Sequence, residues 1–182
     1  MAPGSQFQRV INLSDNEHVI YFAYGSNLLF ARLHARTPSI LNLGIGKLHN
    51  HRLSFTKPGG DGSGKCGIER VDEAHHVLGV LYQMHVEEKP ILDEIEGVGH
   101  GYYDHPIEVH AESGTFDAFT YYPTRLDCEY LPFDWYKRFV LTGAIENNFP
   151  SEYTKMIEAV DAIVDPDHER RTLNLMVGNQ EL

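Results

Sequence analysis

The sequence predicts an α+β fold in a single domain, and three observations support this prediction. The length of 182 residues suits one core, and neither a linker nor an internal repeat divides the chain. Several short segments have the pattern of strands with hairpin-like neighbours. Other segments have helical periodicity, and this mixture is typical of one mixed domain. We expect a loose arm at 1–17, the domain at 18–167 and a polar tail that frays at 168–182.

Six segments have the composition or the alternation of β-strands. Residues 19–24 form a short run of β-branched and aromatic residues, which predicts a strand buried on both faces. The other predicted strands lie at 51–55, 67–71, 77–85, 103–112 and 115–122. The glycine-rich stretch 58–64 between two of them predicts a long flexible loop.

Two short helices are predicted in the first hundred residues. The first covers 28–36, with Asn27 as its candidate N-cap and Pro38 as its stop. The second covers 87–96, where Pro90 is tolerated in the first turn and Gly97 ends the helix.

Two further helices are predicted near the C-terminus. One covers 134–146. The other follows Pro150, and Ser151 is a candidate cap for it. Its apolar stripe is formed by Tyr153, Met156, Ile157, Val160 and Val164.

Charge and composition exclude several classes of protein. The net charge of −11 leaves no basic footprint for a nucleic-acid backbone. No apolar stretch is long enough to span a bilayer, and the first residues lack the pattern of a signal peptide. We therefore expect a cytoplasmic protein without a nucleic-acid or membrane partner. Cys66 and Cys128 are too few for a disulfide scaffold, and we expect ordinary thiols.

Two tempting motifs do not support a cofactor, and the motif of a serine nucleophile is absent. Residues 59–66 resemble a phosphate-binding loop, but Cys66 stands where magnesium needs Ser or Thr, and a strand follows instead of a helix. The pairs His49/His51 and His75/His76 lack a third ligand at a supportive spacing. No GxSxG elbow is present. We expect neither a nucleotide nor a metal.

The first candidate for chemistry is the strand-to-helix turn at 24–28. Gly25 permits a tight bend and the close approach of a ligand to the backbone. The amides of Ser26, Asn27 and Leu28 lie where the predicted helix begins, which favours a carboxylate or an oxyanion. The alternative is that the segment serves only as a turn.

The second candidate is Glu96, in the last turn of the helix predicted at 87–96. Ile91, Leu92 and Ile95 form the apolar stripe of that helix, and Glu96 lies at the boundary of this stripe. A partly buried carboxyl is a candidate for general acid and base catalysis. The alternative is a solvated glutamate at a helix end.

Together these segments resemble the γ-glutamyl cyclotransferase family over about residues 19–165. The resemblance is carried by YFAYGSNL at 21–28, by LDEIEGV at 92–98 followed by Tyr103, and by WYKRFVLTGAIENNFP at 135–150. It implies a compact mixed β-barrel with flanking helices, a homodimer and a place in glutathione metabolism. It also implies that the enzyme needs no cofactor.

The resemblance assigns roles by position. Glu96 matches the acid/base of the family, and Tyr136 matches a tyrosine that contacts the substrate. The stretch that corresponds to the substrate-binding loop comprises Tyr21, Phe22, Ala23, Tyr24, Gly25 and Ser26. Asn27, Tyr103 and Tyr121 are further candidates for the pocket.

The implied reaction is the release of 5-oxoproline from a small γ-glutamyl amide. The α-amine of the substrate attacks its own γ-carbonyl and expels an amino acid, so the enzyme must mainly fold the substrate and move protons. Asn27 favours the branch that acts on γ-glutamyl amino acids over the glutathione-specific (YGSL) and γ-glutamylamine-specific (YGTL) branches. An inactive binding protein on the same fold is the alternative. The glycine-rich loop and Gly99–His100–Gly101 depart from the family pattern, so the sequence leaves the leaving group open.

Overall fold

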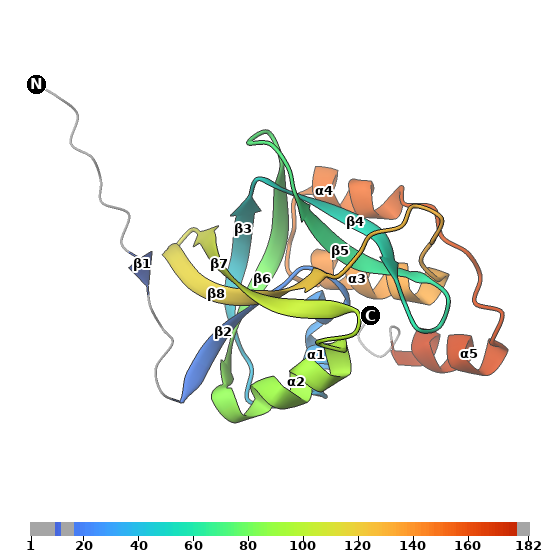
Figure 1. Ribbon diagram of the computed structural model, residues 1–182, viewed down its shortest axis with the longest axis horizontal. Coiled ribbons are helices and arrows are strands. Elements are labelled where there is room, and N and C mark those ends of the chain that lie inside the picture. The colour runs from blue at the N-terminus through green and yellow to red at the C-terminus, as the bar shows by residue number, and fades with distance from the viewer. Residues whose placement is uncertain (1–9, 12–16, 178–182) are drawn as a thin grey trace, which may run out of the picture.

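A closed sheet forms the centre of the molecule (Figure 1). The computed structural model describes residues 10–11 and 17–177. The strand order is β1-β8-β2-β6-β3-β7, and β7 also pairs with β8. The five strands from β8 to β7 in this order therefore close a barrel, and β1 pairs with the start of β8. A separate hairpin, β4–β5, adjoins the barrel. The strands are Val10–Ile11 (β1), His18–Ala23 (β2), Leu41–His49 (β3), His51–Pro58 (β4), Gly64–Arg70 (β5), His76–His85 (β6), Tyr102–Ala111 (β7) and Gly114–Pro123 (β8).

The helices flank the barrel and the hairpin. In Figure 1, α2 lies along the lower side of the barrel, and α3 and α4 lie behind the β4–β5 hairpin. The helices are Phe30–His34 (α1), Lys89–Glu96 (α2), Asp134–Glu146 (α3), Ser151–Glu158 (α4) and His168–Val177 (α5), with the short 3-10 turns Ser26–Leu28 (η1) and Val86–Glu88 (η2). Within the ranges that the structure describes, no helix has the length and apolar content needed to cross a membrane.

Strand β2 passes through the middle of the core, as its composition predicts. It is hydrogen-bonded to β6 along its length and pairs with β8 at Tyr21. The four consecutive residues Ile20 to Ala23 are all buried, and because side chains alternate along a strand, both faces of β2 are covered. Gly143 then brings α3 against the turn that follows β2. A Cβ at position 143 would lie 2.4 Å from the Leu29 nitrogen, so only glycine permits this close approach.

Several predicted elements are confirmed. The mixed α+β class, the barrel with flanking helices and the single domain all hold. Helix α3 has the predicted bounds, and α2 ends where Gly97 adopts the left-handed conformation with φ 71°. The stretch 58–64 is shorter and tighter than a long loop, because the Gly59 amide donates to the Ser63 carbonyl at 2.8 Å and β5 begins at Gly64.

Other local predictions were wrong. Strand β3 was missed because its glycines and polar residues hide its alternation. Asn27 does not cap a helix, since it lies inside η1 and its buried side chain contacts other side chains. Ser151 is the first residue of α4 rather than its cap, and α4 ends at Glu158, before Val160 and Val164.

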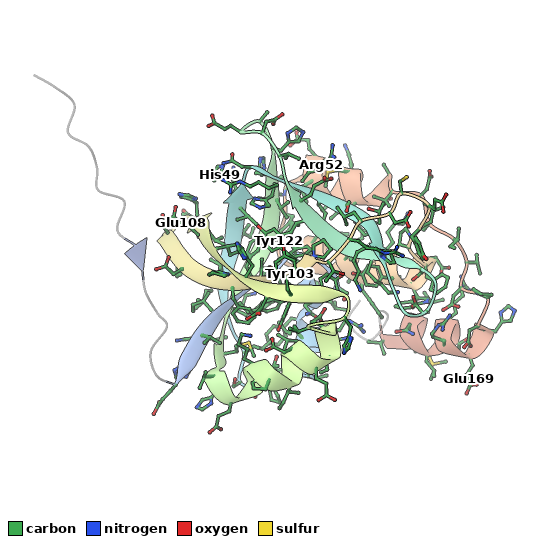
Figure 2. The ribbon with its side chains drawn as sticks, in the orientation of Figure 1. His49, Arg52, Tyr103, Glu108, Tyr122 and Glu169 are labelled. Carbon is green, nitrogen blue, oxygen red and sulfur yellow. The ribbon has the colours of Figure 1, made fainter. Side chains whose placement is uncertain are left out.

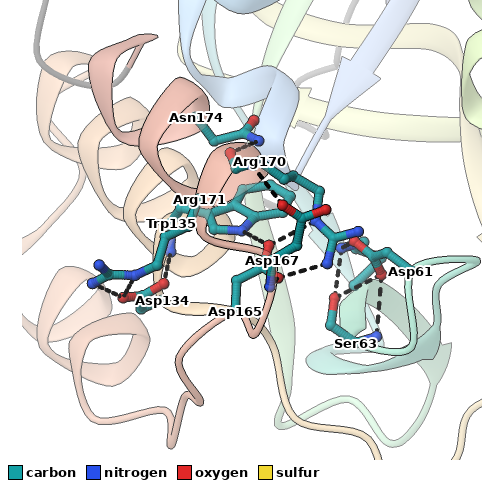
Figure 3. A network of polar contacts seen from close by, with 10 residues as sticks. Asp61, Ser63, Asp134, Trp135, Asp165, Asp167, Arg170, Arg171 and Asn174 are labelled. Carbon is teal, nitrogen blue, oxygen red and sulfur yellow. Dashed lines mark hydrogen bonds and ion pairs between the residues drawn. The ribbon is translucent and has the colours of Figure 1, made fainter.

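The predicted polar tail contains helix α5, which the sequence pattern did not indicate. Two arginines of α5 hold it against α3 and the preceding loop (Figure 3). Arg170 forms two hydrogen bonds to Asp165, at 2.7 and 2.6 Å, and Arg171 binds Asp134. These polar contacts fix a helix that has no fully buried residue. Residues 1–9 and 12–16 of the predicted N-terminal arm and the last five residues lie outside the described residues. Within the arm, Val10–Ile11 pairs with β8, and the Glu17 carbonyl accepts a hydrogen bond from the Val86 amide.

Candidate active site

A two-part pocket lies between the turn after β2, the end of α2 and the β4–β5 hairpin. Its narrow inner chamber has a volume of about 20 Å³, and its wider outer chamber has a volume of about 440 Å³. Both chambers are lined by Ser26, Glu96, Tyr102 and Tyr136, which therefore mark their junction. The inner chamber is completed by Tyr21, Tyr24, Gly25, Asn27, Cys66 and Tyr121. The outer chamber adds four cationic side chains, from Arg32, Arg36, Lys57 and Lys65.

Glu96 lies at this junction, and two donors hold its carboxylate. Its side chain is 19% exposed. One oxygen, Oε1, accepts hydrogen bonds from Arg36 Nη1 at 2.9 Å and from Asn27 Nδ2 at 3.0 Å. The other oxygen, Oε2, accepts no hydrogen bond from any residue in the described ranges. The arrangement therefore orients the carboxylate and leaves one oxygen for proton exchange.

The two donors come from different elements and also bind each other. Asn27 is 3% exposed within η1, and its Oδ1 accepts a hydrogen bond from Arg36 Nη1 at 2.9 Å. Its amide nitrogen also donates to the Tyr21 hydroxyl at 3.1 Å. Arg36 follows α1, where its backbone amide donates to the Leu33 carbonyl. Asn27, Arg36 and Glu96 are thereby each held by at least two hydrogen bonds.

Buried tyrosines form most of the inner wall. Tyr136 accepts a hydrogen bond from the Cys66 amide at 2.9 Å, and Tyr102 donates to the Cys66 carbonyl at 2.6 Å. Tyr121 donates to Asp93 at 2.7 Å. Burial raises the pKa of all five hydroxyls in the chamber, those of Tyr21, Tyr24, Tyr102, Tyr121 and Tyr136. They therefore remain neutral hydrogen-bonding groups at physiological pH and do not act as bases.

The turn at Gly25 lies close to Cys66 and Tyr136, which form the facing wall of the inner chamber. A Cβ at position 25 would lie 3.0 Å from the Cβ of Cys66 and 3.5 Å from the Tyr136 hydroxyl. The glycine therefore keeps this part of the inner chamber open. Burial raises the pKa of the Cys66 thiol to about 12, so Cys66 is protonated and is not a nucleophile at neutral pH.

The helix that the sequence predicts from this turn onward does not begin here; a short 3-10 turn takes its place. The turn η1 contains only three residues, and Leu29 after it is extended. The Leu28 amide donates to the Gly25 carbonyl at 2.9 Å. The predicted anion-binding role therefore falls on the Ser26 and Asn27 amides alone, with little help from a helix dipole.

Three predicted pocket residues do not line the pocket. Phe22 and Ala23 are fully buried in β2 and belong to the core. Tyr103 is 45% exposed and stacks on Tyr122 at 5.8 Å between ring centroids (Figure 2). Because side chains alternate along β7, its neighbour Tyr102 faces the pocket instead. The other predicted residues, Tyr21, Tyr24, Gly25, Ser26, Asn27, Glu96, Tyr121 and Tyr136, line one or both chambers.

Sequence reasoning also missed residues that the structure brings to the site. Arg32 and Arg36 are four positions apart, and this spacing could have placed them on one side of the predicted helix. Lys57, Lys65 and Cys66 come from the β4–β5 hairpin, and no local signal indicated that it reaches the pocket. The two segments that depart from the family pattern also line the outer chamber, through Pro58 to Gly60 and through His100 to Gly101.

A resident metal has no ligand set in the part of the chain that the structure describes. No group of three His, Cys, Asp or Glu side chains there has suitable geometry. His49 does approach another histidine, but it is His110, at 5.0 Å between ring centroids, and the two make an edge contact. Lys65, in the segment that resembles a phosphate-binding loop, binds Asp61 at 2.7 Å and lies within β5.

Comparisons with known proteins find one family model, named relatives and a solved structure that are similar to this chain. The model of the AIG2-like family matches residues 76–157. The chain is 35% identical over 154 residues to the gamma-glutamylcyclotransferase of Bos taurus and 34% identical over 158 residues to that of Homo sapiens, with 81% of each chain covered. A solved structure of a gamma-glutamyl cyclotransferase matches with a TM-score of 0.76 and 28% identity, covering 88% of this chain and 99% of that one.

Proposed function

The chain belongs to the γ-glutamylcyclotransferase family, and we propose that it releases 5-oxoproline from γ-glutamyl amino acids with Glu96 as the proton carrier. One observation carries this assignment. At the junction of the two chambers, the carboxylate of Glu96 is fixed through Oε1 while Oε2 has no protein donor in the described ranges. A group that must take up a proton and later give it back needs such a free oxygen.

The reaction needs no nucleophile from the protein. The α-ammonium of the substrate loses a proton to Oε2, and its nitrogen then attacks the γ-carbonyl carbon. The new carbon–nitrogen bond closes a five-membered ring. Glu96 gives this first proton to the leaving nitrogen, the bond between that nitrogen and the γ-carbon breaks, and Oε2 takes the second proton from the ring nitrogen. Glu96 then passes the second proton to the free amine, which leaves as an ammonium, so the atoms balance and Glu96 returns to its starting form.

The shape of the pocket supports one orientation of the substrate. A volume of about 20 Å³ admits a small polar group but not a whole substrate. We place the α-carboxylate of the glutamyl group there, against the amides of Ser26 and Asn27 and the hydroxyls of the buried tyrosines. The γ-carbonyl then lies beside Glu96 at the junction, and the leaving group extends into the outer chamber. Holding amine and carbonyl in this way supplies most of the catalytic advantage, because an intramolecular attack depends on orientation.

Incubation with γ-glutamyl-L-alanine tests the assignment directly. We expect stoichiometric 5-oxoproline and L-alanine, measured by chromatography, without added metal or nucleotide. Failure to form 5-oxoproline from this and other γ-glutamyl amides would favour a binding protein on the same fold. Product from glutathione or from γ-glutamylamines, but not from γ-glutamyl amino acids, would instead assign the chain to a sister branch.

The resemblance to the family also supports a homodimer and a place in glutathione metabolism, and we propose a cytoplasmic location. A homodimer has a mass of about 41 kDa, twice the 20.7 kDa of one chain. Light scattering after gel filtration measures that mass. A mass near 21 kDa at micromolar concentration would contradict the homodimer without affecting the proposed reaction.

A further inference from the structure

The outer chamber is basic although the chain as a whole is acidic. Four cationic side chains and one carboxylate line this chamber, whereas the whole chain has a net charge of −11. Such a local excess of positive charge concentrates and binds anions. The four cationic side chains differ in whether a carboxylate of the protein already forms an ion pair with them.

Two of the four cations have acidic partners. Arg36 binds Glu96 at 2.9 Å, and Lys65 binds Asp61 at 2.7 Å. Lys65 also donates to the Ser63 hydroxyl at 2.7 Å. Arg36 therefore orients the carboxylate of Glu96, and Lys65 stabilises the turn of the β4–β5 hairpin.

Arg32 has no acidic partner among the residues that the structure describes. Its guanidinium lies 4.8 Å from the centroid of the Phe139 ring, and its Nε is buried without a hydrogen-bond partner. Burial, together with the neighbouring charge of Arg36, lowers the pKa of Arg32 to about 10, so it remains charged at neutral pH. Because the Arg32 side chain lines the outer chamber and no acidic group pairs with it there, an anion bound in that chamber would pair with its guanidinium.

Lys57 is the second cation without an acidic partner in the described ranges. Its side chain comes from β4, the residue is 9% exposed, and Nζ lies 4.3 Å from the centroid of the Tyr102 ring. Burial lowers the pKa of its ammonium, and the charge of Glu96 opposes this shift. The ring contact positions the ammonium but provides no acceptor for its three donors.

We propose that the outer chamber is a subsite for the carboxylate of the leaving amino acid, with Arg32 and Lys57 as the residues that recognise it. This inference rests on the proposed function and deepens it by naming two residues that determine specificity for the leaving group. The scissile bond lies beside Glu96, so the outgoing amino acid occupies the outer chamber. Its carboxylate is the acidic partner for Arg32 and Lys57. The enzyme therefore selects γ-glutamyl α-amino acids and small γ-glutamyl peptides over γ-glutamylamines, which have no carboxylate on the leaving side.

A matched pair of substrates tests this inference. γ-Glutamyl-L-alanine and γ-glutamyl-L-alaninamide have the same reacting atoms and differ only in the charge of the leaving group. We expect kcat/KM of the parent enzyme to be about tenfold to a hundredfold higher for the acid, the range for a charge-assisted hydrogen bond. Equal values of kcat/KM would overturn the subsite while leaving the proposed function intact. Absence of 5-oxoproline from both substrates would overturn the proposed function and the subsite with it.

Substitutions assign the preference to the two residues. In Arg32→Gln and in Lys57→Gln, kcat/KM for the acid should fall about tenfold or more, while the value for the amide should change little. Arg32→Lys should retain part of the preference. Lys155→Gln is the matched control, because Lys155 is exposed on α4 and lines neither chamber. Equal losses on both substrates would overturn the proposal, because they would assign the cations to the α-carboxylate that both substrates share. If Arg32→Gln does not fold, Lys57→Gln decides by the same comparison.

Discussion

The carboxylate of Glu96 is held from one side only. Asn27 and Arg36 both donate to Oε1 and also bond to each other, so neither can rotate away without breaking two hydrogen bonds. The other oxygen, Oε2, accepts no hydrogen bond from the described part of the chain. This asymmetry suits a proton carrier that must keep its position while its charge changes.

Replacement of Glu96 by glutamine should remove catalysis but retain the fold. The amide of glutamine can still accept hydrogen bonds from Asn27 and Arg36, but it cannot take up a proton near neutral pH. We expect kcat to fall at least about a hundredfold, measured as initial rates of 5-oxoproline formation. Glu94→Gln is the matched control, because Glu94 is exposed on the same helix. Near-normal turnover in Glu96→Gln would remove this residue from the mechanism.

Gly25→Ala should narrow the inner chamber. The added Cβ would lie 3.0 Å from the Cβ of Cys66, closer than nearly all such contacts. We expect kcat/KM to fall about tenfold or more, because misplacement of a reacting group by a fraction of an ångström is costly. The change in melting temperature should be small in comparison.

Cys66→Gly provides a specific check on that explanation. Removal of the Cys66 Cβ eliminates the contact, so the double variant Gly25→Ala/Cys66→Gly should regain activity relative to Gly25→Ala. A loss of stability with unchanged kinetic constants in Gly25→Ala would show that Gly25 serves only the turn.

At the scale of single elements, α5 depends on one buried carboxylate. Asp165 is fully buried and accepts hydrogen bonds from Arg170, from the Trp135 indole nitrogen at 2.8 Å and from the Asp167 amide at 2.9 Å (Figure 3). These bonds, led by those from Arg170, hold the pKa of Asp165 well below its usual range. The carboxylate therefore ties the loop, α3 and α5 together.

Asp165→Asn should destabilise the protein by about 2 kcal/mol at pH 7, the range for loss of hydrogen bonds to a charged group, because the Arg170 that loses its partner is one-third exposed. The folded pKa is lower than the unfolded value of about 3.9, so the stabilisation is present above that value. It is lost as the pH falls toward the folded pKa. The difference between parent and variant in urea unfolding should therefore shrink below about pH 4. Asp161→Asn, at an exposed position nearby, should change stability little at either pH. A difference that stays constant down to pH 3 would contradict this account.

Local sequence patterns predict the elements better than they predict the pairing of the strands. The bounds of α3 and the end of α2 follow from periodicity and from Gly97, which are local signals. Strand β3 could not be predicted in the same way, because Gly44 and Gly46 interrupt its pattern. Gly46 is required by the packing of the barrel, since a Cβ there would lie 2.4 Å from a methyl carbon of Val109. Such a requirement is visible only in three dimensions.

The candidate site was predictable only where its residues are adjacent in the sequence. The turn at 24–28 and Glu96 were found because each belongs to a short motif. Arg36 joins them through a contact across 60 positions, and Tyr102 replaces Tyr103 because of the exact phase of β7. The closed barrel determines which side chains of β7 face the pocket and which distant residues meet there. The sequence pattern alone could not predict either.

At the scale of the whole molecule, closure of the barrel brings distant segments to one pocket. The β7–β8 hairpin pairs back to complete the ring, and the β4–β5 hairpin contributes Lys57 and Cys66 to the chambers. The walls therefore come from the barrel, from the separate hairpin and from the helices α2 and α3. The pocket can be shaped by several loops while the position of Glu96 stays fixed.

The nesting of a narrow chamber behind a wide one has a kinetic consequence. The side chains that line only the inner chamber are almost completely buried, so a product held there must leave through the outer chamber. The outgoing amino acid should then depart first and 5-oxoproline last, as in an ordered mechanism with one substrate and two products. In steady-state assays, 5-oxoproline should inhibit competitively and L-alanine noncompetitively against γ-glutamyl-L-alanine. The reverse pattern would mean that the inner chamber has its own exit.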